Sequence, residues 1–196
     1  DLPGHGQSGD ALDPMRSYTL PGLADAVAES AAHLGLSDFV IVGWSLGGHI
    51  GIELMQRCPG LKGLMITGTP PVRRGGMSEG FIASPHFQLA SRPALSDLGV
   101  DAFAMAMFGE PVPPFLRDAI ARTDTRFRQR LFEARRQGAG VDQRAAVESS
   151  ELPLAVINGT DDRLINLDYF DTVAYRNLWN GRCYRLDGVG HAPFWH

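Results

Sequence analysis

A serine lies between two glycines in the segment Gly43-Trp44-Ser45-Leu46-Gly47-Gly48, directly after the apolar run 39–42. A strand followed by Gly-x-Ser-x-Gly is typical of a nucleophile elbow, the strained strand-to-helix turn that exposes a serine hydroxyl. We expect Gly43 and Gly47 to leave room for the neighbouring helix and strand. The backbone N–H of Leu46, at the start of that helix, would stabilise a developing oxyanion. The predicted chemistry is attack of Ser45 on a carbonyl carbon.

A serine nucleophile needs a base and an acid, and two later loops carry the required residue types. The apolar run 154–157 leads into Asp161 and Asp162, and the run 183–186 leads into His191. Loops that follow parallel strands meet at one edge of the sheet, so these side chains can converge on Ser45. We expect His191 to accept the Ser45 proton and one of the two aspartates to orient its ring.

Strands and helices alternate along both ends of the chain, which indicates an α/β fold with a mostly parallel sheet and helices on both faces. Thr19 caps the first predicted helix, and Gly35 ends it. The predicted strands cover 39–42, 64–67, 154–157 and 183–186, and the predicted helices of these parts cover 20–34, 46–57 and 167–177.

Between residues 72 and 150 the alternation stops. Helical stretches at 101–108, 115–122 and 125–137 are separated by Gly and Pro, which indicates a helical cap or lid. The predicted organisation is a hydrolase core in two parts, 1–71 and 151–196, with the cap at 72–150. Its sulfur-containing and aromatic side chains could line a groove for an acyl chain or form the cap's own core: Met77, Phe81, Phe87, Phe103, Met105, Met107 and Phe108.

Composition excludes several function classes. The 196 residues are 44% hydrophobic and carry a net charge of −4, which argues against a nucleic-acid partner. An arginine cluster is interspersed with Asp and Glu, so we expect a solvated helix face there: Arg126, Arg128, Arg130, Arg135 and Arg136. No apolar run has the length of a membrane span, and no secretory signal is present.

The remaining cysteines and histidines point to a metal-independent protein in a reducing compartment. Cys58 and Cys183 lie far apart in apolar settings and are expected to be free thiols, so we expect a cytoplasmic protein. The histidines outside the active site lack metal-ligand spacing, and we expect neither a metal nor a cofactor: His5, His33, His49 and His86. His49 is expected to have a structural role.

These motifs together resemble the α/β-hydrolase fold family along nearly the whole chain. The opening segment 1–8 is similar to the family's loop after the fourth strand, Ser45 to its nucleophile and Gly190-His191 to its catalytic histidine step. The family places its acid three residues after the glycine, which implies Asp162, with Asp161 as the alternative. The resemblance also implies that the chain is truncated at both ends, so that the first four strands and one oxyanion donor are missing. The strand 39–42 would then lie at an exposed edge.

A narrower resemblance is to the metal-independent N-acyl-homoserine lactonases of this fold, which open the lactone ring of quorum-sensing signals. It is carried by the segments 43–53, 63–72, 109–111, 121–124 and 177–179. It implies lactone hydrolysis, or quorum quenching, through a serine ester. Phe103 departs from the pattern, because the resemblance implies a substrate-binding tyrosine there. Trp44, beside the nucleophile, could touch ligand or pack in the core.

Two alternatives to a lactonase remain open at this point. The same fold hosts general carboxylesterases and carbon–carbon bond hydrolases, which share the elbow and differ in substrate. A ligand-binding protein could also keep the triad and use the pocket for sensing. In every case the expected partner is a small molecule, and for an enzyme it is an ester or lactone with an acyl chain.

Overall fold

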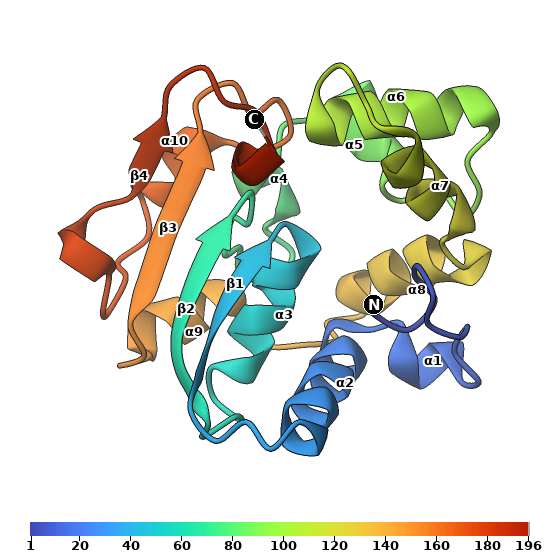
Figure 1. Cartoon of the computed structure of the whole chain (residues 1–196). Coiled ribbons are helices and arrows are strands. Elements are labelled where there is room, and N and C mark those ends of the chain that lie inside the picture. The colour runs from blue at the N-terminus through green and yellow to red at the C-terminus, as the bar shows by residue number, and fades with distance from the viewer. Residues whose placement is uncertain (196) are drawn as a thin grey trace.

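Four parallel strands form a sheet in the order β1-β2-β3-β4. Figure 1 shows them side by side with their carboxyl ends at one edge. The strands are β1 (Phe39–Trp44), β2 (Leu61–Thr67), β3 (Leu154–Gly159) and β4 (Tyr184–Leu186). The computed structural model describes residues 1–195 of the chain. The predicted parallel α/β fold is confirmed.

β1 lies at the edge of this sheet, as the sequence predicted. Its two outward valines, Val40 and Val42, are 63% and 69% exposed. The alternate positions Phe39 and Ile41 point toward the helices and pack against the core cluster beneath. β1 and β2 extend as far as the pair Trp44 and Thr67, so the register carries β1 right up to the nucleophile.

The helices that accompany the sheet are α2 (Leu20–His33), α3 (Leu46–Leu54) and α9 (Gln143–Ser149). Thr19 caps α2 through its hydroxyl oxygen, which accepts the Gly22 N–H at 3.0 Å. α3 packs against β1 and β2, with α2 and α9 on its two sides. Ile52 of α3 and Leu64 of β2 are both nearly inaccessible to solvent in the resulting core. A core of this kind holds α3, and therefore the elbow, rigidly on the sheet.

The prediction of a helix at 167–177 is wrong in its length. α10 covers only Leu167–Phe170. After α10, backbone N–H groups form hydrogen bonds to another part of the chain. The Ala174 N–H donates to the Glu148 carboxylate, and the Arg176 N–H donates to the Val147 carbonyl oxygen. Because these long-range bonds occupy the amides that a helix would use, tertiary contacts override the local helical pattern.

Residues 72–150, here called the helical segment, connect β2 to β3. They contain α4 (Met77–Gly80), α5 (Pro85–Leu89), α6 (Asp97–Phe108), α7 (Pro114–Arg122), α8 (Thr125–Arg136) and α9. Figure 1 shows α5, α6 and α7 apart from the sheet, while α9 lies beside it under β3. α9 contributes Ala146 and Val147 to the core of the sheet. α8 contributes Phe127 and Leu131 to a second core cluster, which it shares with α2 and α3. The helical segment therefore divides into the outer helices α5, α6 and α7 and two helices, α8 and α9, that pack on the core.

Three shorter elements complete the chain: α1 (Pro14–Ser17), η1 (Trp179–Gly181) and η2 (Pro193–Trp195). Within residues 1–195, none of the helices combines the length and apolar character that crossing a membrane requires. Both cysteines, Cys58 and Cys183, are free and half-buried.

Candidate active site

Ser45 occupies a strained turn between β1 and α3. Its φ of +49° and ψ of −114° lie outside the regions that residues with a side chain ordinarily adopt. The strain is held in place by β2, because the Ser45 N–H donates to the Thr67 carbonyl oxygen at 2.8 Å. This is the geometry of a nucleophile elbow, in which the backbone presents the serine hydroxyl away from the sheet.

The glycines around the turn are required for close packing, although not the pair that the sequence predicted. A Cβ on Gly43 would lie 2.6 Å from the Gly48 Cα. A Cβ on Gly48 would overlap the Thr69 hydroxyl, whereas one on Gly47 would meet nothing within 4 Å. The steric prediction is therefore confirmed for Gly43 and wrong for Gly47, because the crowded face of α3 carries Gly48.

Thr69 is a supporting residue that sequence analysis missed. It is fully buried, and its hydroxyl lies 2.9 Å from the carbonyl oxygens of both Ser45 and Thr67. The adjacent Gly68 N–H donates to the Asn158 side-chain oxygen at 2.8 Å, which ties the ends of β2 and β3 together. In the sequence, these residues could have been found only from their positions directly after predicted strands.

His191 and Asp162 form a buried pair. The Nδ1 of His191 lies 2.7 Å from Oδ2 of Asp162, and the side chains are 2% and 1% exposed. The other carboxylate oxygen of Asp162 accepts the Leu164 N–H at 2.9 Å. Asp161 is exposed, so of the two adjacent acids the structure brings Asp162 to the histidine. The Nε2 of His191 is buried and makes no hydrogen bond among residues 1–195, to Ser45 or to any other residue.

β4 and β1 lie on opposite edges of the sheet, so the loop that carries His191 must cross the ends of the strands between them. At the end of β3, the Asp161 N–H donates to the Val189 carbonyl oxygen at 2.9 Å. At the end of β2, the His191 ring passes so close to Gly68 that a Cβ there would lie 2.6 Å from its Cε1. Next to Ser45, the Trp44 indole N–H donates to the His191 carbonyl oxygen at 2.8 Å. These contacts bring the histidine to the elbow.

Trp44 therefore has two roles that the sequence could not separate. It anchors the histidine loop, and its ring also lines the cavity beside Ser45. The ring centroid lies 5.3 Å from those of Phe108 and Phe194. A position next to the nucleophile thus links the loop after β4 to the helical segment.

The arrangement can perform acyl transfer. Leu46 is the first residue of α3, and the first N–H groups of a helix have no acceptor within it. The Leu46 N–H can therefore donate to an oxyanion formed at Ser45, and such a donor is typically worth about 10²- to 10³-fold in rate. Within residues 1–195, no group of three His, Cys, Asp or Glu side chains is placed to hold a metal ion.

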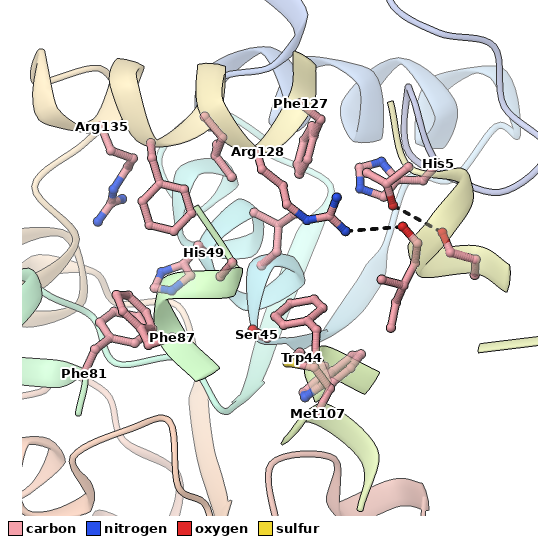
Figure 2. A pocket seen from close by; sticks show the side chains of 18 of the residues that line it. His5, Trp44, Ser45, His49, Phe81, Phe87, Met107, Phe127, Arg128 and Arg135 are labelled. Atoms are coloured by element: carbon pink, nitrogen blue, oxygen red, sulfur yellow. Dashed lines mark hydrogen bonds between the residues drawn. The ribbon is translucent and has the colours of Figure 1, made fainter. Parts of the chain in front are cut away.

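A cavity of about 350 Å³ opens above Ser45 (Figure 2). Its wall is mainly apolar and comes from the elbow and the helical segment. Of the seven Met and Phe residues expected either to line a groove or to pack, all but Met105 line it. The apolar wall consists chiefly of Trp44, Leu46, Met77, Phe81, Phe87, Phe103, Met107, Phe108, Leu116, Ile120, Phe127, Leu131 and Phe132. A volume and lining of this kind suit a small acyl compound.

Two arginines of α8 contribute to this wall, and for these two the sequence prediction of a solvated arginine face is wrong, whereas Arg126 is exposed as expected. Arg128 is only 8% exposed, and Arg135 also lines the cavity. Arg136, by contrast, is exposed as expected. Phe127, Leu131 and Ala134 form an apolar stripe on the buried side of α8. Arg128 and Arg135 each follow a member of this stripe in the sequence and therefore lie at its margin, next to the cavity.

His49, one helical turn after Ser45, lines the cavity through a neutral ring. The Gln143 side-chain amide donates to the His49 carbonyl oxygen, so its own oxygen accepts the Nδ1–H of His49 at 2.6 Å. Burial, together with the positive charge of Arg135, lowers the pKa of His49 to about 3. The expected structural role is thus combined with a place at the cavity wall.

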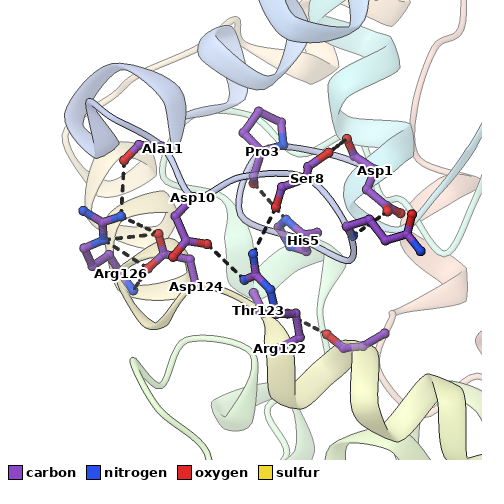
Figure 3. A network of polar contacts seen from close by, with 12 residues as sticks. Asp1, Pro3, His5, Ser8, Asp10, Ala11, Arg122, Thr123, Asp124 and Arg126 are labelled. Atoms are coloured by element: carbon purple, nitrogen blue, oxygen red, sulfur yellow. Dashed lines mark hydrogen bonds and ion pairs between the residues drawn. The ribbon is translucent and has the colours of Figure 1, made fainter.

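The N-terminal loop is fastened to α7 and α8, which fixes the position of His5 at the cavity (Figure 3). Arg122 donates to the Asp10 carboxylate and to the Ser8 carbonyl oxygen, both at 3.0 Å. The Asp124 N–H donates to the Gly4 carbonyl oxygen at 2.8 Å. Polar contacts between these distant segments hold one side of the cavity in place.

Comparisons with known proteins agree with this geometry. A family model described as the alpha/beta hydrolase family matches residues 1–196. Two relatives are named pimeloyl-[acyl-carrier protein] methyl ester esterase. The one from Stenotrophomonas maltophilia is 30% identical over 203 residues, covering 99% of this chain and 74% of the relative. The one from Aromatoleum aromaticum is 30% identical over 223 residues, covering 98% and 79%.

Among solved structures, one of the most similar is that of the N-acyl homoserine lactonase AidH complexed with N-butanoyl homoserine. It has a TM-score of 0.97 and 48% identity, covering 99% of this chain and 71% of that one. A putative aryl esterase from Burkholderia cenocepacia superposes with a TM-score of 0.77 at 22% identity, covering 100% of this chain and 72% of its own. The latter likeness shows the fold alone.

Proposed function

The chain belongs to the alpha/beta hydrolase family and is an ester-hydrolysing enzyme, and we propose that it opens the ring of N-acyl homoserine lactones. The observation that carries the lactone proposal is the likeness to the lactonase AidH, at 48% identity over nearly the whole chain. The apolar cavity above Ser45 supports it, because the substrate combines a cyclic ester with an acyl chain. We place this activity in the cytoplasm, in keeping with the free cysteines.

In the proposed mechanism, Ser45, His191 and Asp162 act as a catalytic triad. His191 Nε2 takes the hydroxyl proton while the Ser45 oxygen attacks the lactone carbonyl carbon, and Asp162 stabilises the imidazolium through Nδ1. The Leu46 N–H stabilises the oxyanion. Collapse of the tetrahedral intermediate breaks the ring C–O bond, and His191 returns its proton to the alkoxide. Water, activated by the same histidine, then cleaves the Ser45 ester and leaves N-acyl homoserine.

The outer helices of the helical segment would act as the cap over the acyl chain, between core parts 1–71 and 151–196. Trp44 and Phe103 would contact the substrate, since both line the cavity. α9 packs with the sheet core and would form the junction of the cap with the core.

A second candidate is a carboxylesterase for linear esters. Two observations favour it: the relatives from Stenotrophomonas maltophilia and Aromatoleum aromaticum are named methyl ester esterases, and Phe103 stands where the lactonase resemblance implies a tyrosine. Phenylalanine cannot donate the hydrogen bond to a lactone oxygen that the resemblance implies for a tyrosine.

The test compares N-hexanoyl homoserine lactone with p-nitrophenyl hexanoate on the purified protein. We expect a higher kcat/KM for the lactone, with N-hexanoyl homoserine identified as the product by mass spectrometry. Hydrolysis of the aryl ester with the lactone left intact would support the carboxylesterase instead. A burst of one equivalent without steady turnover would indicate a ligand-binding protein.

Ser45→Ala tests the nucleophile itself. The variant should no longer be labelled by an organophosphonate probe and should lose turnover of both substrates. Labelling that survives the substitution would place the nucleophile elsewhere.

A further inference from the structure

Arg128 is a buried cation in the wall of a mainly apolar cavity. Its side chain extends from α8 into the cavity on the side of His5, as Figure 2 shows, and the residue is 92% buried, being 8% exposed. Burial lowers the pKa of this guanidinium, and no nearby carboxylate opposes that effect. An arginine nevertheless stays protonated in proteins, so a positive charge faces the cavity.

The neighbours of Arg128 leave that charge uncompensated. One terminal nitrogen donates to the Ile120 carbonyl oxygen at 3.4 Å, and the guanidinium carbon lies 5.7 Å from the centre of the Phe103 ring. Among residues 1–195, no Asp or Glu forms an ion pair with it. Burial lowers the pKa of the nearby His5, and its Nδ1 lies 3.0 Å from the Pro3 carbonyl oxygen.

Two other arginines of α8, Arg126 and Arg135, have carboxylates nearby that compensate their charge. Arg126 pairs with the Asp124 carboxylate at 2.7 Å. Arg135 also lines the cavity, but the carboxylates of Glu53 and Asp142 offset part of the effect of its burial on its pKa. Arg128, by contrast, contacts only the Ile120 carbonyl oxygen and the face of the Phe103 ring.

A buried guanidinium without a counter-charge is costly, and an acceptor oxygen would relieve that cost through charge-assisted hydrogen bonds. Apart from the His5 ring and the Thr123 hydroxyl, the cavity wall near Arg128 is hydrocarbon. A bound molecule can therefore supply the acceptor oxygen. We propose that Arg128 is a substrate-binding residue that takes an acceptor oxygen, a carbonyl or a carboxylate, carried by the acyl chain beyond the scissile carbonyl. This inference rests on the proposed hydrolysis at Ser45 but not on the lactone.

The substrate class follows from this. The enzyme should prefer acyl chains that bear an oxygen over plain hydrocarbon chains of the same length. For lactones the oxygen is the amide carbonyl or a 3-oxo group, and for linear esters it is a distal carboxylate, as in a half-ester of a dicarboxylic acid. Plain p-nitrophenyl esters should gain nothing from Arg128.

The experiment measures kcat/KM of the wild type and of Arg128→Met for two pairs of substrates. Within each pair, one acyl chain carries an additional oxygen-containing group and the other does not. The first pair is N-(3-oxohexanoyl) and N-hexanoyl homoserine lactone, and the second is mono-p-nitrophenyl adipate and p-nitrophenyl hexanoate. We expect Arg128→Met to lower kcat/KM about 10- to 100-fold for whichever substrates use the guanidinium. Hydrolysis of p-nitrophenyl hexanoate should stay within about twofold of wild type or rise, since an apolar wall suits that chain.

The pairs distinguish the sources of the oxygen. A loss confined to the 3-oxo lactone assigns the keto group, an equal loss for both lactones assigns the amide carbonyl, and a loss for the adipate half-ester assigns a carboxylate. If wild type leaves both lactones intact, the proposed lactonase function fails while the aryl-ester pair still tests Arg128.

Arg136→Met is the matched control, because it removes an exposed arginine from the same helix. It should leave all four substrates unchanged. Arg128→Lys keeps the charge and should recover part of the lost selectivity. The melting temperature of Arg128→Met should be equal to or higher than that of wild type, since an uncompensated buried charge is removed. A uniform loss on all four substrates, or no loss on any of them, would overturn the proposal.

Discussion

The sheet and the helical segment contribute to the site in different ways. Around the sheet, the chemical groups lie on strand-end loops and are held by short bonds between those ends, such as Ser45 to Thr67 and Asp161 to Val189. In the helical segment, the cavity wall is made mainly of apolar side chains, and its charged exceptions, Arg128 and Arg135, come from α8. We therefore expect the sheet to govern the reaction and the helical segment to govern the choice of substrate.

A physical reason underlies this division. Hydrogen bonds between strand ends are directional and position atoms to a few tenths of an ångström, which proton transfer requires. Apolar contacts are not directional, and methionine in particular adapts to the shape of its neighbour. Substitutions near the sheet should therefore change kcat, whereas those in the helical segment should change selectivity between substrates.

The largest expected effect tests the sheet side. Asp162→Asn keeps the shape of the side chain but removes the charge that stabilises the His191 imidazolium, and it should lower kcat by up to about 10⁴-fold. Asp161→Asn, which alters the exposed neighbour, should change kcat by less than about threefold by analogy with surface substitutions. Steady-state kinetics on one good ester substrate measures both. If the Asp161 variant suffers the larger loss, the acid must be reassigned.

A smaller effect is expected where the two regions meet. Trp44→Phe keeps an aromatic ring at the cavity but removes the N–H that holds the His191 carbonyl oxygen. A lost hydrogen bond of this kind corresponds to roughly a 2- to 10-fold fall in kcat. Because the wall remains aromatic, KM should change less than kcat.

The control for this variant is Trp179→Phe, which alters an exposed tryptophan that stacks on Tyr184. It should leave both constants unchanged. A rise in KM with unchanged kcat in Trp44→Phe would mean that Trp44 serves the substrate rather than the histidine loop.

An effect of similar size, but on selectivity rather than on kcat, is expected within the helical segment. Phe103→Tyr adds a hydroxyl at the cavity wall that can donate to a lactone oxygen. We expect the ratio of kcat/KM for hexanoyl lactone to that for p-nitrophenyl hexanoate to rise about 2- to 10-fold. Phe115→Tyr, at an exposed position on α7, is the matched control. An unchanged ratio would show that Phe103 does not face the lactone.

Much of the reaction site could be predicted because its signals are local. An apolar run followed by Gly-x-Ser-x-Gly specifies a strand, a turn and a helix within about a dozen residues, so Ser45 and Leu46 were identifiable at once. The acid and the histidine were found from their places after later strands. The residue that holds the histidine loop, Trp44, was visible but its role was not, because its hydrogen-bond partner lies 147 residues away.

The errors share one cause, which is contact between distant segments. The helix predicted at 167–177 stops at Phe170 because α9 supplies bonding partners for the backbone beyond it. Gly48 rather than Gly47 is crowded because Thr69 of a different loop packs against it. Local periodicity contains no information about either neighbour.

The sequence by itself determined the fold class and predicted the nucleophile and the order of its partners, since backbone preferences and the spacing of apolar residues are local properties of the chain. Only the tertiary structure decided that Asp162 rather than Asp161 reaches His191 and that Arg128 is buried while Arg136 is exposed. The two aspartates are chemically identical, and so are the two arginines of α8. Within each pair, the members differ only in the residues that the rest of the chain packs against them. Burial and pairing therefore require the folded protein.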